Sequence, residues 1–177
     1  MHQDIIELPA AYSQADLPYL PKPNTVDVIL TETESPAEIT RSAFVLPFLE
    51  TGELVLATIN ARGVEIPGGH IEAGESSIVA AERECLEETG CSLQGLTPIG
   101  FLRLHSTGEK PEGWKYPHPL GCQQFYAGLV RDMQAFTTNA ECGEPTVVPT
   151  EKVEEFLREA DLPFYHRARE MLFGANP

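Results

Sequence analysis

The chain has 177 residues, of which 42% are hydrophobic and 22% are charged, and 27 acidic residues against 12 basic ones give a formal net charge of −15. This length and composition fit one soluble globular domain with its own core. No stretch of about 18 apolar residues, the length needed to cross a membrane, is present. The negative charge disfavours nucleic acid and anionic membranes as partners, because both repel an acidic surface.

The N-terminal segment lacks the basic and apolar regions of a secretory signal, so we expect a cytoplasmic protein. The four cysteines form no C-x-x-C pair, which argues against a zinc site and against a thioredoxin-like motif. We expect them to be buried free thiols in a reducing compartment. They are Cys85, Cys91, Cys122 and Cys142. The sequence does not fix the oligomeric state, and a homodimer stays an open alternative.

Residues 1–23 contain four prolines and predict an extended arm, followed by a single domain over residues 24–177. Alternating apolar residues then predict three strands. These are Thr25–Leu30, Ile39–Leu49 and Leu54–Ile59. The last two flank a turn at residues 50–53 and read as a β-hairpin. Pro47 predicts an edge position or a bulge in this hairpin, because proline cannot donate a ladder hydrogen bond.

The clearest helix is Ser76–Thr89, which follows a short extended stretch and the turn Pro67-Gly68-Gly69. Ser76 and Ser77 are candidate N-caps, and Gly90 is placed to end the helix in a left-handed conformation. A helical wheel gives a broad apolar arc that we expect to be buried. Its members are Ile78, Val79, Ala81, Cys85, Leu86 and Thr89.

The second half of the chain predicts two further strands, Leu96–His105 and Gly121–Leu129, joined by a polar loop over Ser106–Leu120. Two helices are predicted after them: Thr150–Glu159, capped by Thr150, and Leu162–Phe173, with Pro163 in its first turn and Gly174 beyond its end. Strands on both sides of a central helix, with helices at the C-terminus, indicate a layered α/β domain.

Three carboxylates stand out on the Ser76–Thr89 helix. Glu84, Glu87 and Glu88 fall within an arc of about 100°. Like charges three and four residues apart destabilise a helix, and a divalent cation would offset that cost. Carboxylate oxygens are ligands that Mg²⁺ prefers. Taken alone, the cluster is more typical of a solvated acidic helix face, because charge runs are common on protein surfaces.

The wider pattern narrows the interpretation. The charged and glycine positions fit one fixed template, whose two apolar positions are here Cys85 and Cys91. The template residues are Gly69, Glu75, Arg83, Glu84, Glu87, Glu88 and Gly90. This pattern resembles the box of the Nudix (MutT-like) hydrolase family. The resemblance implies an α/β/α sandwich with a mixed central sheet.

The family resemblance also implies a chemistry, the hydrolysis of a diphosphate linkage by water with Mg²⁺, or Mn²⁺, as cofactor. It implies that Glu84, Glu87, Glu88 and the carbonyl of Gly68 are metal ligands, and that Glu75 and Arg83 support them. Glu87 or Glu88 is favoured as the general base inside the box. Outside it, Glu141 and Glu144 precede the predicted helix at Thr150, and Glu144 is the preferred additional acid at the metal.

A nucleotide-like small molecule is the expected substrate. His70 is a candidate for contact with a phosphate, with a solvated histidine as the alternative. Tyr116 and His118, with Trp114, are candidates to stack on a base or recognise a ribose, with packing of this loop against the sheet as the alternative. By elimination of the patterns typical of ADP-ribose, dinucleoside polyphosphate, NADH and coenzyme A subgroups, we expect a nucleoside di- or triphosphate. The alternatives are a nucleotide-sugar or dinucleotide hydrolase, an isopentenyl diphosphate isomerase, a non-catalytic nucleotide-binding Nudix module and an acidic interaction domain.

Overall fold

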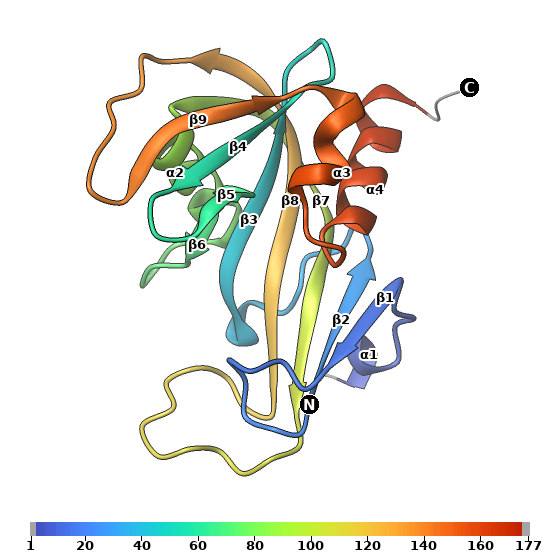
Figure 1. The fold of residues 1–177 in the computed structure, drawn as a ribbon. Helices are drawn as coiled ribbons and strands as arrows, with labels where there is room; N and C mark the ends of the chain where they lie inside the picture. The colour runs from blue at the N-terminus through green and yellow to red at the C-terminus, as the bar shows by residue number, and fades with distance from the viewer. Residues whose placement is uncertain (1–2, 175–177) are drawn as a thin grey trace.

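The computed structural model describes residues 3–174, which form a nine-stranded sheet covered by helices (Figure 1). The sheet order is β1-β2-β7-β8-β3-β4-β5, and β6 pairs with β3 while β9 pairs with β4. The strands are β1 (Tyr12–Ala15), β2 (Asn24–Leu30), β3 (Thr40–Phe48), β4 (Leu54–Ile59), β5 (Gly63–Glu65), β6 (Gly68–His70), β7 (Cys91–Ser106), β8 (Leu120–Met133) and β9 (Cys142–Val148). The helices are α1 (Gln3–Ile6), η1 (Ala37–Ile39), α2 (Ser77–Thr89), η2 (Thr150–Lys152), α3 (Val153–Phe156) and α4 (Leu162–Phe173).

The sheet is mixed and lies between two helical layers. Strands β3 and β8 run parallel, and the other described pairings are antiparallel. Helix α2 packs on one face, and α3 and α4 pack on the other (Figure 1). The predicted α/β/α sandwich with a mixed central sheet is therefore confirmed. No helix in residues 3–174 combines the length and apolar character needed to span a membrane.

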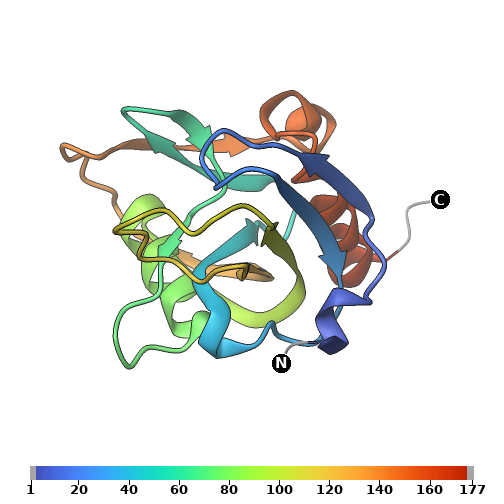
Figure 2. The ribbon, with the colours of Figure 1, turned by 90° about the horizontal axis from the view of Figure 1, so that it is seen from below.

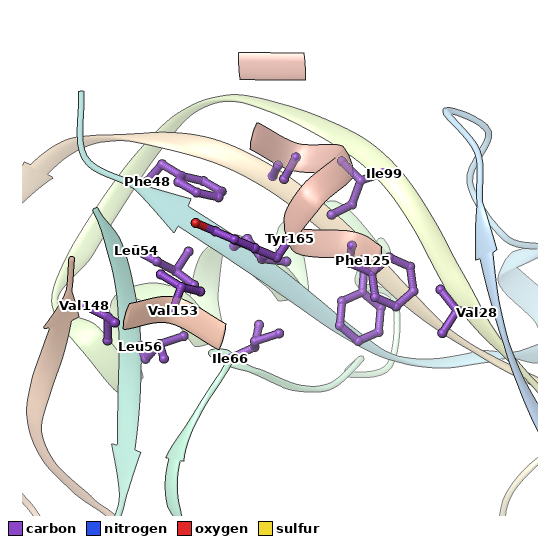
Figure 3. Packing of buried hydrophobic residues seen from close by; sticks show 14 of the residues in the cluster. Val28, Phe48, Leu54, Leu56, Ile66, Ile99, Phe125, Val148, Val153 and Tyr165 are labelled. Carbon is purple, nitrogen blue, oxygen red and sulfur yellow. The ribbon is translucent and has the colours of Figure 1, made fainter. Parts of the chain in front are cut away.

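Aromatic stacking holds α4 against the sheet (Figure 3). Phe125 of β8 stacks on Phe164 of α4 with ring centroids 4.1 Å apart and an interplanar angle of 6°. Phe48 of β3 stacks on Tyr165 at 6.0 Å. These four rings are buried, so their contact combines a large apolar area with favourable ring geometry.

The predicted hairpin of Ile39–Leu49 and Leu54–Ile59 forms next to its turn, but the expectation of a ladder along both strands is wrong. Strands β3 and β4 share a single register pair, Phe48 with Leu54. Strand β3 pairs instead with β8 and β6, and β4 pairs with β5 and β9. Long-range partners therefore replace the local hairpin ladder beyond the turn.

Pro47 lies in an interior strand, so its predicted edge position is also wrong. The N–H of Val45 donates to the carbonyl of Pro67 at 3.1 Å on the side of β3 away from β8. The backbone nitrogen of Pro47 points to the same side of β3 as that of Val45, because the direction of the backbone nitrogens alternates along a strand. The described β6 pairing has ended at Phe44 and the β4 pairing begins at Phe48. A missing N–H in this gap costs no ladder bond.

Several element boundaries differ from those predicted. Strands β7 and β8 are both longer than predicted, and β9 forms where no strand was expected. The helix predicted over Thr150–Glu159 is wrong in length, because a 3-10 turn precedes α3 and the chain turns extended at Leu157. Thr150 does not cap this helix with its side chain; its hydroxyl donates to the carbonyl of Gly52 at 2.9 Å.

The N-terminal segment is fixed to the sheet by strand β1 and by the side chain of Arg103. Strand β1 adds to β2 in antiparallel register. The guanidinium of Arg103 donates to the carbonyls of Ile5, Ile6 and Leu8 at 2.6, 2.8 and 3.1 Å. It also pairs with Asp27 at 2.8 Å. This charge-assisted cluster orients residues 5–8 and supplies partners for carbonyls at the end of α1.

Helix α2 has the predicted bounds and end. Gly90 follows it with φ of 73°, and its N–H donates to the carbonyl of Leu86. Ser76 occupies the N-cap position without a side-chain capping bond. The predicted burial of Val79 and Leu86 is wrong, since they are 49% and 41% exposed. The buried stripe is narrower than the predicted arc and consists of Ala80, Ala81, Cys85 and Thr89.

Candidate active site

A cavity of about 1,290 Å³ lies where several distant segments meet. Its lining comes from β3, β6, α2, the β4–β5 turn, the β7–β8 loop, the start of β9 and the link between β1 and β2. Figure 2 shows this link beside the β7–β8 loop, where the N–H of Thr107 donates to the carbonyl of Pro23 at 2.9 Å. Of the three predicted glutamate ligands, Glu84 and Glu88 line the cavity.

Arg83 is the central cation of the carboxylate cluster. Its guanidinium donates two 3.0 Å hydrogen bonds to the carboxylate of Glu75, a bidentate pair. The same group reaches Glu84 at 3.0 Å, Glu87 at 3.2 Å and the carbonyl of His70 at 3.1 Å. The hydrogen bond from Arg83 lowers the pKa of Glu75, and the pKa of Arg83 is raised in turn. Arg83 thus ties α2 to the loop before it.

Strand β6, at the start of the loop before α2, lies so close to β3 and to α2 that glycine is required at two of its positions. Gly68 has φ of 154°, and a Cβ there would overlap the backbone of Ala43 and Phe44. A Cβ on Gly69 would overlap the carboxylate of Glu84. The N–H of Gly68 donates to Oε2 of Glu88 at 2.9 Å. The absence of side chains at both positions therefore brings the loop backbone within reach of two carboxylates.

Glu88 has an electrostatically costly environment. Its pKa is raised to about 7: burial raises it most and the charges of Glu84 and Glu65 add to this, whereas the hydrogen bond from Gly68 and the charge of Arg62 lower it. Glu84 and Glu88 are four residues apart on one face of α2, where like charges repel. A cation between them would relieve both the repulsion and the cost of burial.

Glu87 lies apart from this pair. Its side chain is 59% exposed and is paired with Arg83. Glu87 is absent from the cavity lining. Within residues 3–174 no three His, Cys, Asp or Glu side chains are arranged to hold a metal ion. The three predicted carboxylate ligands therefore do not converge on one point in this structure.

The donor atoms present nevertheless fit Mg²⁺. The carboxylates of Glu84 and Glu88 offer hard oxygen donors in the lining of the cavity, and the backbone of Gly68 lies beside Glu88. In proteins Mg²⁺ is often held by one or two carboxylates, with water and substrate phosphates completing its coordination. Two converging glutamates are thus sufficient for this ion.

The two acids before α3 are placed differently from one another. Glu144 is exposed on β9 and is absent from the cavity lining. Glu141, just before β9, lines the cavity. The pKa of the neighbouring Cys142 thiol is raised, most of all by burial and then by the charges of Glu88, Glu141 and Glu84, so these three carboxylates act on the same thiol. The structure therefore brings Glu141, rather than Glu144, to the two cavity glutamates.

An aromatic group lines the same cavity. His70 stacks on Tyr116 with ring centroids 5.8 Å apart, and Trp114 meets Tyr116 edge-on at 5.3 Å. His118 also lines the cavity, with its Nε2 3.0 Å from the carbonyl of Gly108. Tyr116 is 45% exposed, so part of its ring surface is open to a ligand.

Two parts of the lining were missed by sequence reasoning. The β4–β5 turn brings Arg62 and Glu65 beside Glu88, and the link after β1 contributes Tyr19, Leu20 and Pro21. Neither segment has a recognisable binding motif. Both are brought to the cavity by strand pairings between residues far apart in the chain, which local sequence patterns do not reveal.

Comparison with known proteins points to one family. The family model described as the NUDIX domain matches residues 38–172. The phosphatase NudJ of Escherichia coli strain K12 is 45% identical to this chain over 53 residues. Those residues are 29% of this chain and 33% of NudJ, so the chain aligns with about a third of the length of the curated relatives it matches.

Solved structures share the fold at low sequence identity. The pyrophosphohydrolase BsRppH of Bacillus subtilis matches with a TM-score of 0.67 and 20% identity, over 93% of this chain and 99% of that one. A binary complex of C. elegans Ap4A hydrolase matches with a TM-score of 0.56 and 16% identity, over 77% and 99% of the two chains. The NUDIX domain of Shewanella oneidensis NrtR with ADP ribose matches with a TM-score of 0.57 and 16% identity, over 78% and 90%.

Proposed function

This chain belongs to the Nudix family of hydrolases, and we propose that it cleaves a diphosphate linkage in a nucleoside di- or triphosphate with Mg²⁺ as cofactor. The observation that supports this most strongly is the convergence of Glu84 and Glu88 on the loop at Gly68 and Gly69. Glycines let the loop backbone approach the two carboxylates at one end of a cavity that also contains aromatic rings. A phosphate-bearing ligand with a base fits both features.

Each residue of the cluster has a part in this proposal. Glu84 and Glu88, with the carbonyl of Gly68, hold the cation. Arg83 and Glu75 fix α2 against the loop, so the carboxylates keep their orientation. Glu88 is also the best-placed box residue to accept a proton from the attacking water, because it lines the cavity and its Oε2 is held by the N–H of Gly68. Bound Mg²⁺ would neutralise phosphate oxygens and activate water for attack on phosphorus.

Glu87 and the remaining acids have secondary parts. Glu87, paired with Arg83 outside the cavity, orients the guanidinium, and it would have to change rotamer to ligate the same cation. Glu141 is a stronger candidate than Glu144 for the further acid at the metal, because it lines the cavity beside Cys142. Mn²⁺ would replace Mg²⁺ in the same set of oxygen donors.

The aromatic group supports a nucleoside rather than a simple phosphate as the rest of the substrate. Stacking of a base on Tyr116 is sequence-tolerant, because every base has a π face. His70 continues the stack towards β6 and Gly69, so phosphates would extend from the base to the carboxylates. A reducing compartment such as the cytoplasm suits the four free, buried cysteines.

A second candidate is a larger substrate, such as a nucleotide-sugar or a dinucleotide. The observation that favours it is the cavity volume of about 1,290 Å³. Pockets for drug-sized ligands are usually about 300–1,000 Å³, so a second moiety beyond the diphosphate would have room.

A hydrolysis screen tests both candidates. The protein would be incubated with Mg²⁺ and nucleoside di- and triphosphates, nucleotide-sugars and dinucleotides, and the products separated as phosphate, diphosphate and nucleoside monophosphate. We expect turnover that stops on chelation and is fastest with nucleoside di- or triphosphates. Faster turnover of the two-moiety substrates would favour the second candidate. Nucleotide binding without turnover of any of them would instead indicate a non-catalytic module.

A further inference from the structure

We infer that Arg62 binds a phosphate group of the substrate next to Glu88, and that Glu65 competes with the substrate for it. This inference rests on the proposed function and assigns a binding residue outside the Nudix box. The cavity needs such a residue, because most charged side chains that line it are acidic. These acids are Glu65, Glu72, Glu84, Glu88, Glu141 and Asp161.

Arg62 is mounted on a well-anchored turn. Its N–H donates to the carbonyl of Ile59 at 3.0 Å, which closes the β4–β5 turn. Ile59 in turn pairs with both Gly63 of β5 and Cys142 of β9. The amide of Asn60 also donates to the carbonyls of residues 139 and 140 at 3.1 and 3.2 Å. The backbone of Arg62 is thus fixed at the edge of the cavity.

The side chain of Arg62 lies within electrostatic reach of the carboxylate pair. Its charge lowers the pKa of Glu88, although burial, which raises that pKa, has the largest effect. The same charge lowers the pKa of Cys142, which burial and the charges of Glu88 and Glu84 raise. Both Arg62 and Glu88 line the cavity. A phosphate held at Glu88 through a divalent cation would therefore lie between the cation and a guanidinium.

The contact that holds Arg62 in the free protein is weak enough to be exchanged. Its Nε donates to Oε2 of Glu65 at 3.0 Å, and the two side chains are 61% and 38% exposed. Exposed ion pairs at this spacing are worth little, whereas an arginine–phosphate contact can be bidentate. A phosphate can consequently displace Glu65 from the guanidinium.

The other arginines near the cavity are less suitable. Arg83 already binds three carboxylates and a carbonyl. Arg158 forms a bidentate pair with Asp161, at 2.7 and 3.1 Å. Arg41 has no ion pair among residues 3–174, but it lies opposite Ile71, three residues along from Gly68. At the rise of a strand, these three residues put the backbone of Arg41 about 10 Å along the sheet from the level of Gly68.

The test compares variants in steady-state hydrolysis of a nucleoside triphosphate and in calorimetric binding of its non-hydrolysable imido analogue. We expect Arg62→Gln to raise KM and weaken analogue binding about 10- to 100-fold, the loss typical of a hydrogen bond to a charged group, with kcat within about threefold. Arg62→Lys should recover part of the affinity. The matched control is Arg167→Gln, which removes the ion pair between Arg167 on α4 and Glu32 and should leave both values unchanged.

Glu65→Gln distinguishes competition between Glu65 and the phosphate for Arg62 from simple repulsion of the phosphate by the Glu65 charge. If Glu65 competes for Arg62, this change lowers KM about two- to threefold in the wild-type background and has no effect in the Arg62→Gln background. Equal effects in both backgrounds would overturn the competition. Wild-type-like binding by Arg62→Gln, or a larger loss with Arg41→Gln, would overturn the assignment of Arg62 while leaving the proposed function intact. A wild-type protein that neither binds the analogue nor hydrolyses nucleotides would overturn both.

Discussion

Glu88 of α2 accepts a 2.9 Å hydrogen bond from the backbone N–H of Gly68, twenty residues earlier in the chain. This bond joins the loop and the helix that together hold the charged residues of the cavity. It satisfies one oxygen of a partly buried carboxylate and leaves its charge without full compensation, because Glu84 lies beside it and raises its pKa. The loop backbone and the carboxylates of α2 therefore form one unit, and the negative charge of this unit would be compensated by a bound cation.

The two loop glycines should respond differently to alanine. Gly68→Ala would place a Cβ against the backbone of Ala43 and Phe44 at a left-handed φ. We expect it to lower the free energy of unfolding by about 2–4 kcal/mol, from strain and overlap together. Gly69→Ala meets the end of the Glu84 side chain, which can move aside. It should reduce kcat about 10-fold or more with a small change in stability.

Chemical denaturation and steady-state kinetics on the two glycine variants would measure these effects. Equal losses of stability in both would contradict the distinction between a backbone overlap at residue 68 and a displaced carboxylate at residue 69.

The metal-free protein should lose stability as the pH rises through the range in which Glu88 titrates. An acid whose pKa is raised in the folded state binds its proton more tightly there than in the unfolded chain. The contribution of Glu88 to the free energy of unfolding therefore falls as the pH rises from its ordinary pKa of 4.5 to its folded pKa of about 7. Above pH 7 this contribution stays constant. Solvent exposure reduces the effect, and we expect about 1–2 kcal/mol.

Urea denaturation in EDTA at pH 5 and pH 7.5 measures this loss. Glu88→Gln removes the titrating group and should flatten this part of the profile. Glu87→Gln, which alters the exposed neighbour, should keep the slope of the wild type. Adding Mg²⁺ should stabilise the wild type more at pH 7.5 than at pH 5. Identical profiles for the wild type and Glu88→Gln would exclude Glu88 as the source.

Arg83 should be sensitive even to lysine. Its guanidinium binds Glu75 bidentately while also contacting Glu84 and Glu87. A lysine ammonium cannot reproduce that fork. We expect Arg83→Lys to lower kcat about 10- to 100-fold through misplaced carboxylates, with weaker Mg²⁺ dependence as a second sign. Retention of the wild-type rate and Mg²⁺ dependence would show that the network does not position the site.

Tyr116 should contribute to nucleoside affinity. Loss of base stacking costs about 1–3 kcal/mol, so Tyr116→Ala should raise KM for a nucleoside triphosphate about 5- to 150-fold. Tyr116→Phe keeps the ring and should behave like the wild type. The matched measurement is competition by inorganic tripolyphosphate, which lacks a base and should be unaffected by either change. An equal loss for both ligands would mean that Tyr116 supports the loop rather than the base.

Local signals explain which elements were predictable. Helix α2 follows from the charged and apolar residues within one segment and from Gly90 at its end, all of which act over a few residues. Strand β9 was missed because Cys142–Val148 contains glycine and proline, and it forms through pairing with β4 more than eighty residues earlier. The short ladder of the β3–β4 hairpin has the same origin, since partners distant in sequence take the hydrogen bonds that local partners were expected to share.

The candidate site shows the same division between features that local spacing predicts and features that depend on tertiary structure. The spacing within α2 predicts that Glu84 and Glu88 share a face, and both line the cavity. It cannot predict that Arg83 draws Glu87 outward, because this depends on the position of Glu75 on the preceding loop. Nor can it distinguish Glu141 from Glu144, since register at the start of β9 decides which acid faces the cavity. Tertiary structure alone places Arg62 in the same cavity lining as Glu88.

The most direct test of the central claim is the rate of Mg²⁺-dependent nucleoside triphosphate hydrolysis by Glu88→Gln, with Glu87→Gln measured alongside. If Glu88 binds the cation and accepts the proton from water, its substitution should lower kcat at least about 100-fold at saturating Mg²⁺. The exposed Glu87 should matter less, with a loss of about 10-fold. A near-wild-type rate for Glu88→Gln, in a protein that is folded and still requires Mg²⁺, would contradict the account.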